Sequence, residues 1–333
     1  MNNSGDKLSF SKRKDSGRIK QIGFFAFQLV KFKYQLNNLS RILKPVVPAG
    51  EFSMLDKAHL SFSSLFRHML FSVLCFFAAW MMVVIFQNAI HAFLLYLNGI
   101  HFSYSLFAIS YLPGDIYEWD EGSMLLIYSL PYFGYFLLGA FLAAKTGRML
   151  LVSWKHRLLL TWISIHLMVF FMASVLKGVF VYREFGIAFQ WVVEVFYLRL
   201  VIAGLIIAFA VWYVKKEVVY LFLKSVPVRI FLSTEILRKT WLSWIAGFSF
   251  LPGILLAFFL WRSFMSFQVL ATLMIFPLII PAIINSSAYI SDIKIPKSKK
   301  NVPSYTFVVS VLAAIWVALK LLSGYSLIIN SLA

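Results

Sequence analysis

Long uncharged stretches alternate with short charged connections along most of this chain. A stretch of roughly 20 apolar residues is typical of a helix that crosses the hydrocarbon core of a bilayer. Seven stretches meet this length, at about 67–97, 123–144, 157–177, 194–214, 240–261, 265–291 and 304–329. We therefore predict an all-α polytopic membrane protein with about seven transmembrane helices, which make up a transmembrane domain over residues 67–333.

The first 66 residues have a different pattern. Residues 1–22 are polar and basic, and a short aromatic segment at 23–30 ends at Lys31 and Lys33. That segment is too short for the apolar region of a signal peptide, and it is typical of a segment that lies in the membrane interface. We predict a basic cytoplasmic arm over residues 1–66 with interfacial amphipathic segments.

The charged connections predict the orientation of the chain. Lysine and arginine concentrate between the second and third, the fourth and fifth, and the sixth and seventh stretches. The connection 98–122 has no basic residue and carries Asp115, Glu118, Asp120 and Glu121. Because basic connections stay on the cytoplasmic side, we expect a cytoplasmic N-terminus and an external C-terminus in the cell (inner) membrane.

The same acidic connection contains a short alternating pattern. Polar and apolar residues alternate from His101 to Leu106, and Pro113-Gly114 follows as a turn signal. Alternation with a period of two is typical of a strand. We therefore predict a small strand-like extracytoplasmic element after the first helix.

The composition narrows the classes of function. Hydrophobic residues make up 61% of the chain and charged residues 13%, against roughly 25% charged residues in soluble domains. The net charge of +18 lies around the spans, so the expected partner is the anionic lipid of the inner leaflet and not nucleic acid. Cys75 is the only cysteine, and no phosphate-binding loop or dinucleotide fingerprint is present. We expect no metal and no cofactor.

Polar residues interrupt the end of the first stretch. Gln87 and His91 are four residues apart and share one face of a helix, with Asn88 one position round. Amide and imidazole groups are costly in hydrocarbon unless they find partners. This group is therefore a candidate site.

The frame around His91 resembles the site-2 protease family of intramembrane metalloproteases. That family carries H-E-x-x-H on a membrane helix, and Gln87-Asn88-Ala89-Ile90-His91 occupies this frame here, followed by Ala92 and by Gly99-Ile100. The segment 102–106 follows where the family has strands, and Ser129-Leu130-Pro131 is similar to the family's Gly-Pro. The resemblance implies a membrane helix that leads into strands, with two further helices around it.

This chain departs from the family at the residues that carry its chemistry. Gln87 stands at the first zinc-ligand position and Asn88 at the general base, and the later spans offer no aspartate as third ligand. A carboxamide is a poor zinc ligand, and asparagine cannot take a proton from water. We therefore expect a pseudo-protease without catalytic residues and without metal.

Four further polar residues lie in the predicted spans: His166, Glu194, Arg199 and Lys320. In the predicted orientation they lie at or near the outer half of the bilayer, as His91 does. One interpretation is a common outer-leaflet polar pocket of Gln87, Asn88, His91, His166, Glu194, Arg199 and Lys320. The other is that these are separate residues, with a structural His166 and interfacial charges.

Two functions are consistent with these features. The first is a non-catalytic membrane protein that binds a peptide, a lipid or a partner protein through the outer pocket. The alternative is a transporter or permease subunit for a small charged solute, in which Glu194, Arg199 and Lys320 contact the solute. Internal pseudo-symmetry and broken helices at mid-membrane would favour the transporter.

Overall fold

Helices make up nearly all of the described chain in the structure, which is a computed structural model. The structure describes residues 62–105, 108–111, 121–148, 153–182, 184–226, 229–232, 234–260, 267–287, 290, 310, 313, 317 and 326–329. All of them belong to one compact unit, Val47–Ala333. The predicted arm 1–66 lies outside the described residues except for its last five.

Four helical segments of the described chain are long and apolar enough to cross a membrane. Three are single helices, α3 (Phe62–Leu97), α4 (Glu121–Arg148) and α5 (Trp154–Phe180). The fourth runs through α7 (Phe196–Tyr213), the π-helical segment η2 (Val214–Val218) and α8 (Val219–Lys224). They coincide with the first four predicted stretches, and a mainly helical chain with helices of membrane-spanning length is confirmed.

The later stretches are less regular. The fifth contains α9 (Glu235–Leu242), the π-helical segment η4 (Ser243–Gly247) and α10 (Phe248–Leu260). The sixth contains α11 (Phe267–Ser286), with Pro277 and Pro281 inside the helix. Most of the seventh lies outside the described residues.

The end of the seventh stretch is a strand, not the helix that was predicted to reach residue 329. Strand β3 (Ser326–Ile329) pairs antiparallel with β1 (Phe102–Ser105), which also pairs antiparallel with β2 (Ala108–Tyr111). The sheet order is β2-β1-β3. Strand β1 pairs with the backbone of β3 along one side, and the β-branched isoleucines of β3 suit a pleated strand, so the helix pattern does not continue to residue 329.

Gly99 makes the turn from α3 into the sheet. Its φ is +73°, a left-handed conformation that suits glycine. The Ile100 N–H donates to the Leu95 carbonyl and the Gly99 N–H donates to the Tyr96 carbonyl, which is the Schellman pattern of a helix end. Leu95 and Ile100 are both buried in a small cluster with Phe102, so this cap fixes the direction in which β1 leaves the helix.

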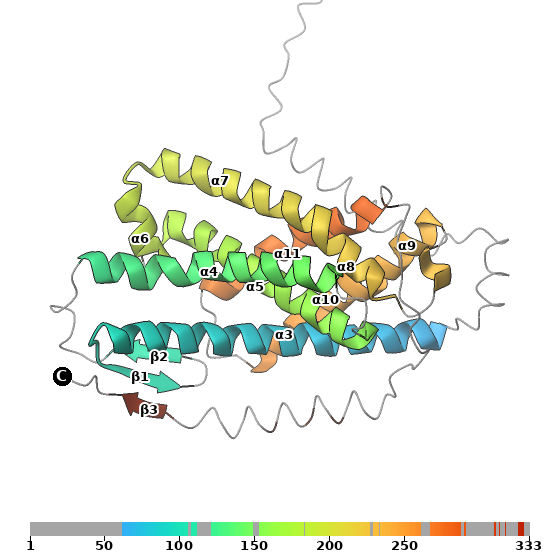
Figure 1. The fold of residues 1–333 in the computed structure, drawn as a ribbon, viewed down its shortest axis with the longest axis horizontal. Helices are drawn as coiled ribbons and strands as arrows, with labels where there is room; N and C mark the ends of the chain where they lie inside the picture. The colour runs from blue at the N-terminus through green and yellow to red at the C-terminus, as the bar shows by residue number, and fades with distance from the viewer. Residues whose placement is uncertain are drawn as a thin grey trace, which may run out of the picture. The chain divides into compact units, whose positions relative to one another are not determined.

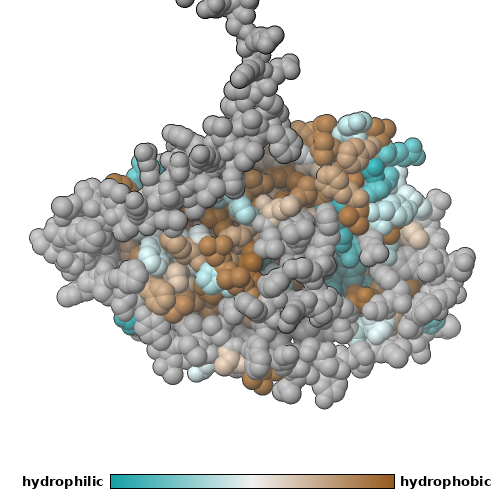
Figure 2. Space-filling view, turned by 180° about the vertical axis from the view of Figure 1, so that it is seen from behind, coloured by the Kyte–Doolittle hydropathy of each residue, from teal (hydrophilic) through white to brown (hydrophobic). Residues whose placement is uncertain are grey.

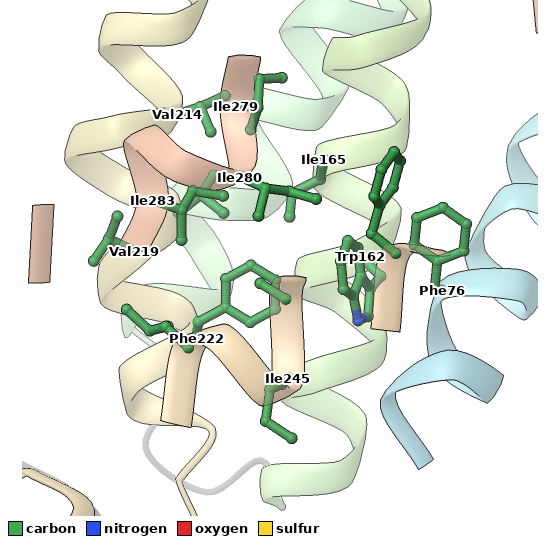
Figure 3. Close-up of a cluster of buried hydrophobic side chains, with 14 of the residues drawn as sticks. Phe76, Trp162, Ile165, Val214, Val219, Phe222, Ile245, Ile279, Ile280 and Ile283 are labelled. Atoms are coloured by element: carbon green, nitrogen blue, oxygen red, sulfur yellow. The ribbon is translucent and has the colours of Figure 1, made fainter. Parts of the chain in front are cut away.

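Helix α5 lies at the centre of the helices and packs against α3, α4, α6, α7, α8 and α11 (Figure 1). The main apolar core contains Phe76 from α3, Trp162 from α5, Phe222 from α8 and a set of isoleucines from α11 (Figure 3). Burial here comes from helices far apart in the sequence. The packing therefore fixes how far each helix is rotated about its axis.

The two ends of the helices differ in character. At one end the three-stranded sheet lies beside the end of α3, with the start of α4 and the helix α6 (Phe185–Val192) nearby (Figure 1). At the other end the α4–α5 connection meets α8, because Lys224 Nζ donates to the Gly147 carbonyl and Arg157 donates to the Lys224 carbonyl. Two of the basic connections thus lie together, away from the sheet.

Candidate functional site

His91 lies on the inward face of α3 near the sheet end. It is 6% exposed, and its ring packs edge-on against Tyr132 of α4 with ring centroids 5.5 Å apart. Asn88 is also buried, while Gln87 is half-buried. The structure therefore keeps the three polar residues of the α3 frame together at one interface.

The hydrogen bonding of His91 shows which of its two ring nitrogens has no partner among the described residues. Its Nδ1 lies 3.3 Å from the carbonyl oxygen of Gln87, and because a carbonyl can only accept, Nδ1 carries the proton. The Nε2 atom of the neutral ring is then an acceptor. It is buried and receives no hydrogen bond from the described residues. An unsatisfied buried acceptor costs about 1–3 kcal/mol, so a donor that reaches it is favoured.

Two tyrosines of α4 line the same interface, since they are three residues apart and share a helix face. Tyr135 donates its hydroxyl to the Gln87 carbonyl at 3.4 Å. Tyr132 donates to the carboxylate oxygen Oε2 of Glu184 at 3.4 Å. Both rings are about 1% exposed. The phenol groups give an apolar interface a small number of polar atoms.

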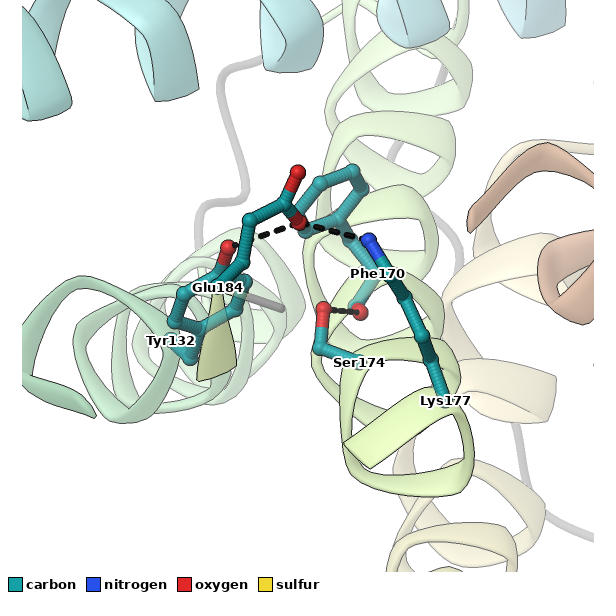
Figure 4. A network of polar contacts seen from close by, with 5 residues as sticks. All are labelled: Tyr132, Phe170, Ser174, Lys177 and Glu184. Atoms are coloured by element: carbon teal, nitrogen blue, oxygen red, sulfur yellow. Dashed lines mark hydrogen bonds and ion pairs between the residues drawn. The ribbon is translucent and has the colours of Figure 1, made fainter. Parts of the chain in front are cut away.

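Glu184 also forms an ion pair with Lys177, which lies near the end of α5. The distance from Lys177 Nζ to Glu184 Oε2 is 2.7 Å, and the exposed fractions of the two side chains are 8% and 48%. Figure 4 shows the Glu184 carboxylate between Tyr132 and Lys177. The ammonium group is therefore removed from solvent, while the carboxylate remains accessible.

The turn between α5 and α6 places Glu184 in this position. Glu184 is the residue before α6, and its φ of 51° with ψ of −126° is a strained conformation for a residue with a side chain. Its carboxylate does not cap α6. Gly178 and Gly186 let the two helices approach closely, since a Cβ on Gly186 would lie 2.0 Å from the Val181 carbonyl oxygen. The Gln190 side chain closes the turn by donating to the Gly178 carbonyl.

These contacts join four residues into one unit, which we call the polar cluster: His91, Tyr132, Lys177 and Glu184. Glu184 bonds to both Tyr132 and Lys177, and the Tyr132 ring packs against the His91 ring. The four residues come from α3, α4, α5 and the start of α6. Three helices and a strained turn therefore present one ammonium, one carboxylate, one phenol and one imidazole at the sheet end of the protein.

The other predicted pocket residues lie elsewhere. His166 on α5 packs against Phe76 with ring centroids 4.5 Å apart; Phe76 is fifteen residues before His91 on α3, or about 22 Å along the helix axis. Glu194 is exposed, and Arg199 lies 5.8 Å from the Phe196 ring. No hydrogen bond or ion pair joins them to the polar cluster within the described part of the chain. Lys320 lies outside the described residues.

The sequence pattern did not predict three members of the polar cluster as site residues: Tyr132, Lys177 and Glu184. Lys177 is the last residue of the predicted span 157–177, and Glu184 falls in the connection that follows. Seven residues separate them, which is longer than the i, i+4 separation of side chains that contact each other on a helix. A lysine at the end of an apolar helix followed closely by a glutamate was the available signal. Only the turn with φ of 51° brings the two groups together.

The polar cluster combines charged and neutral polar groups. Among the described residues no group of three or more His, Cys, Asp or Glu side chains is arranged to hold a metal ion. The side chains of the polar cluster instead offer the N–H groups of Lys177, the hydroxyl group of Tyr132, and acceptor atoms on His91 and Glu184. No protein family, no curated protein and no solved structure matches this chain.

Proposed function

We propose that this chain is a multi-pass integral membrane protein without catalytic activity, which binds the polar part of a ligand at the polar cluster. The observation that carries the proposal is the ion pair between the nearly buried Lys177 and the half-exposed Glu184. Ionisable groups inside a membrane-spanning region are expensive to hold and are associated with function. A buried pair is weak evidence for a role in stability alone.

The proposed topology has seven spans, a cytoplasmic N-terminus and an external C-terminus in the cell (inner) membrane. The grouping of basic connections at the end opposite the sheet supports it. The antiparallel pairing of β1 with β3 adds support, because an odd number of spans is needed if the segment after α3 and the C-terminal segment are on the same side. In this topology the polar cluster lies toward the outer leaflet.

A relationship to the intramembrane metalloproteases, with loss of their activity, is part of this proposal. Helix α3 runs from His91 through Gly99 into strands, and Tyr132 of α4 packs on His91. Gln87 and Asn88 leave the frame without a zinc ligand and a general base at these two positions. Both observations support a binding protein that keeps part of a protease-like arrangement.

A comparison of two ion pairs tests the binding function. Lys177→Met with Glu184→Gln removes the charges of the polar cluster, and Lys239→Met with Glu235→Gln removes the exposed pair within α9 as the matched control. Each protein is extracted from its native membrane, and the lipids and peptides that it retains are identified by mass spectrometry.

We expect at least one species that is enriched on the wild-type and control proteins and lost from the polar-cluster variant. The thermal unfolding midpoint of each variant verifies that the fold is intact. Identical sets of retained species on all three folded proteins would contradict the proposed function.

A further inference from the structure

We propose that the ligand of the polar cluster is a membrane lipid with an uncharged, hydroxyl-bearing headgroup. Its hydroxyl groups would donate to His91 Nε2 and to the second carboxylate oxygen of Glu184. This inference rests on the proposed function and specifies the chemical class of the ligand. It is carried by the acceptor atoms, the charge balance and the apolar surroundings of the polar cluster.

Two acceptor atoms of the polar cluster, on His91 and Glu184, receive no hydrogen bond within the described chain. His91 Nε2 is buried and receives no hydrogen bond within the described chain. Glu184 uses only Oε2 to bind Lys177 and Tyr132, and in Figure 4 its other oxygen points away from both of these residues. A ligand that supplies O–H donors satisfies both atoms, whereas a headgroup without donors satisfies neither.

The charges of the polar cluster select an uncharged headgroup. Lys177 already neutralises Glu184 at 2.7 Å, so the pair has no net charge to attract an ion. An anionic phosphate close to the free acceptors would meet the Glu184 carboxylate, and an ammonium would meet the Lys177 charge. The neutral pair gives an ion no net attraction, and the two free acceptor atoms bind an O–H group directly, so neutral hydroxyl groups match these atoms best.

The surface next to the polar cluster is apolar and aromatic. Exposed aromatic and aliphatic side chains follow the ends of α5 and α6 and the start of α7, namely Phe180, Tyr182, Val192, Phe196 and Tyr197. Phe180 and Phe196 contact each other with ring centroids 6.0 Å apart. In Figure 2 hydrophobic side chains adjoin hydrophilic ones at the upper right, the end where α6 and α7 meet in Figure 1. Tyrosines at such a boundary are typical of the headgroup level.

A lipid reaches this site from the bilayer, with its headgroup against Glu184 and its chains along exposed apolar helices. Glu184 is the accessible member of the polar cluster, with 48% of its side chain exposed. Helix α7 has exposed apolar residues along most of its length, including Leu205 and Phe209. An amphiphile therefore fits this region better than a free sugar, which would leave the apolar surface uncovered.

The test uses the full chain in nanodiscs of dioleoyl phosphatidylcholine, whose headgroup has no donor. Each disc contains a small equal fraction of one further dioleoyl lipid: glucosyl diacylglycerol, phosphatidylglycerol or phosphatidylethanolamine. Glucoside and maltoside detergents are avoided because their headgroups also carry hydroxyl groups. Native mass spectrometry of the released protein measures the enrichment of each lipid over phosphatidylcholine.

We expect the glucosyl lipid to be enriched roughly fivefold to tenfold, as two added hydrogen bonds allow, and the two charged headgroups to be less enriched. His91→Phe keeps the ring against Tyr132 and removes the acceptor, so it should lower the enrichment severalfold. His166→Phe makes the same change in the distant aromatic core and should leave the enrichment unchanged.

Equal or stronger enrichment of phosphatidylglycerol or phosphatidylethanolamine, or no effect of His91→Phe, would overturn the inference. If another ligand still depends on Lys177 and Glu184 in the comparison of ion pairs, only the lipid class is wrong. If no ligand depends on them, the proposed function fails as well.

Discussion

Lys177 and Glu184 form an ion pair of 2.7 Å across the end of a helix. Lys177 lies in the last turn of α5, and Glu184 follows the helix at a left-handed turn. The pair combines a shielded ammonium with an accessible carboxylate. Loss of the carboxylate would leave a shielded ammonium without its partner, whereas loss of the ammonium would leave a carboxylate that solvent can reach.

Removing the carboxylate alone should therefore lower the free energy of unfolding more than removing both charges does. Glu184→Gln leaves the Lys177 charge shielded and without its carboxylate, and we expect a loss of about 1–2 kcal/mol after allowance for the exposure of Glu184. Adding Lys177→Met should restore part of this loss because the uncompensated charge is gone. A double-mutant cycle by chemical denaturation measures the coupling, and strictly additive effects would contradict the expectation.

His91→Phe should leave stability unchanged or raise it by up to about 1 kcal/mol. The substitution removes a buried acceptor without a donor and keeps an aromatic ring against Tyr132. The thermal unfolding midpoint in lipid-free detergent measures this effect. A clear loss of stability would indicate that Nε2 is already satisfied within the protein, and the site would then have no acceptor for a ligand.

Gly186→Ala should destabilise the turn between α5 and α6 strongly. A Cβ at this position would lie 2.0 Å from the Val181 carbonyl oxygen, and overpacking of this kind costs about 1–3 kcal/mol. Gly204→Ala in α7 is the matched control, because nothing lies within 4 Å of its added Cβ. Alanine is favoured over glycine in a helix by about 1 kcal/mol, so the control should be neutral or stabilising in the same unfolding assay.

The pairing of β1 with β3 predicts a specific disulfide. Ser103 lies opposite Ile328 in the register, and side chains of directly opposed residues are close enough to be linked. Ser103→Cys with Ile328→Cys should therefore cross-link on mild oxidation, as a mobility shift under non-reducing electrophoresis. Ser103→Cys with Leu327→Cys places the second thiol on the other face of the sheet and should not. Preferential linkage of the control pair would show that the register is wrong.

Labelling of the same positions from outside the cell tests the proposed topology. Single cysteines at Ser103 and Ile328 should both react with a membrane-impermeant reagent in intact cells, whereas a cysteine at Lys239 should react only after permeabilisation. The native Cys75 is buried and contributes little background. Reaction of Lys239→Cys alone in intact cells would reverse the orientation.

The hydrophobic pattern predicted the long helices well, because a helix of membrane-spanning length needs only a local run of apolar residues. The four spans at 65–97, 122–148, 154–180 and 196–224 follow such runs. The pattern failed where distant segments decide the structure. Residues 326–329 were included in the last apolar stretch although Ser323-Gly324 interrupts it, and they are a strand because β1, more than 200 residues earlier, supplies the pairing groups.

The candidate site, too, was only partly predictable from the sequence. The frame of Gln87, Asn88 and His91 was evident in the sequence, since helical spacing alone puts these residues on neighbouring positions. The partners of His91 were not, because they depend on how α4 and α5 are rotated and on the turn at Glu184. Grouping by depth in the membrane was a poor guide, as His166 faces a core of aromatic rings and Glu194 faces outward.

Chain composition and periodicity alone determined that this protein is mainly helical and apolar, and where its long helices run. Tertiary structure alone decided that Lys177 meets Glu184, that Tyr132 joins them to His91, and that the C-terminal segment completes a sheet. The physical reason is how far apart along the chain the interacting residues lie. A helix is specified by neighbours within a few residues, whereas an ion pair or a strand pairing is specified by the packing of segments whose separation along the chain carries no information about their contact.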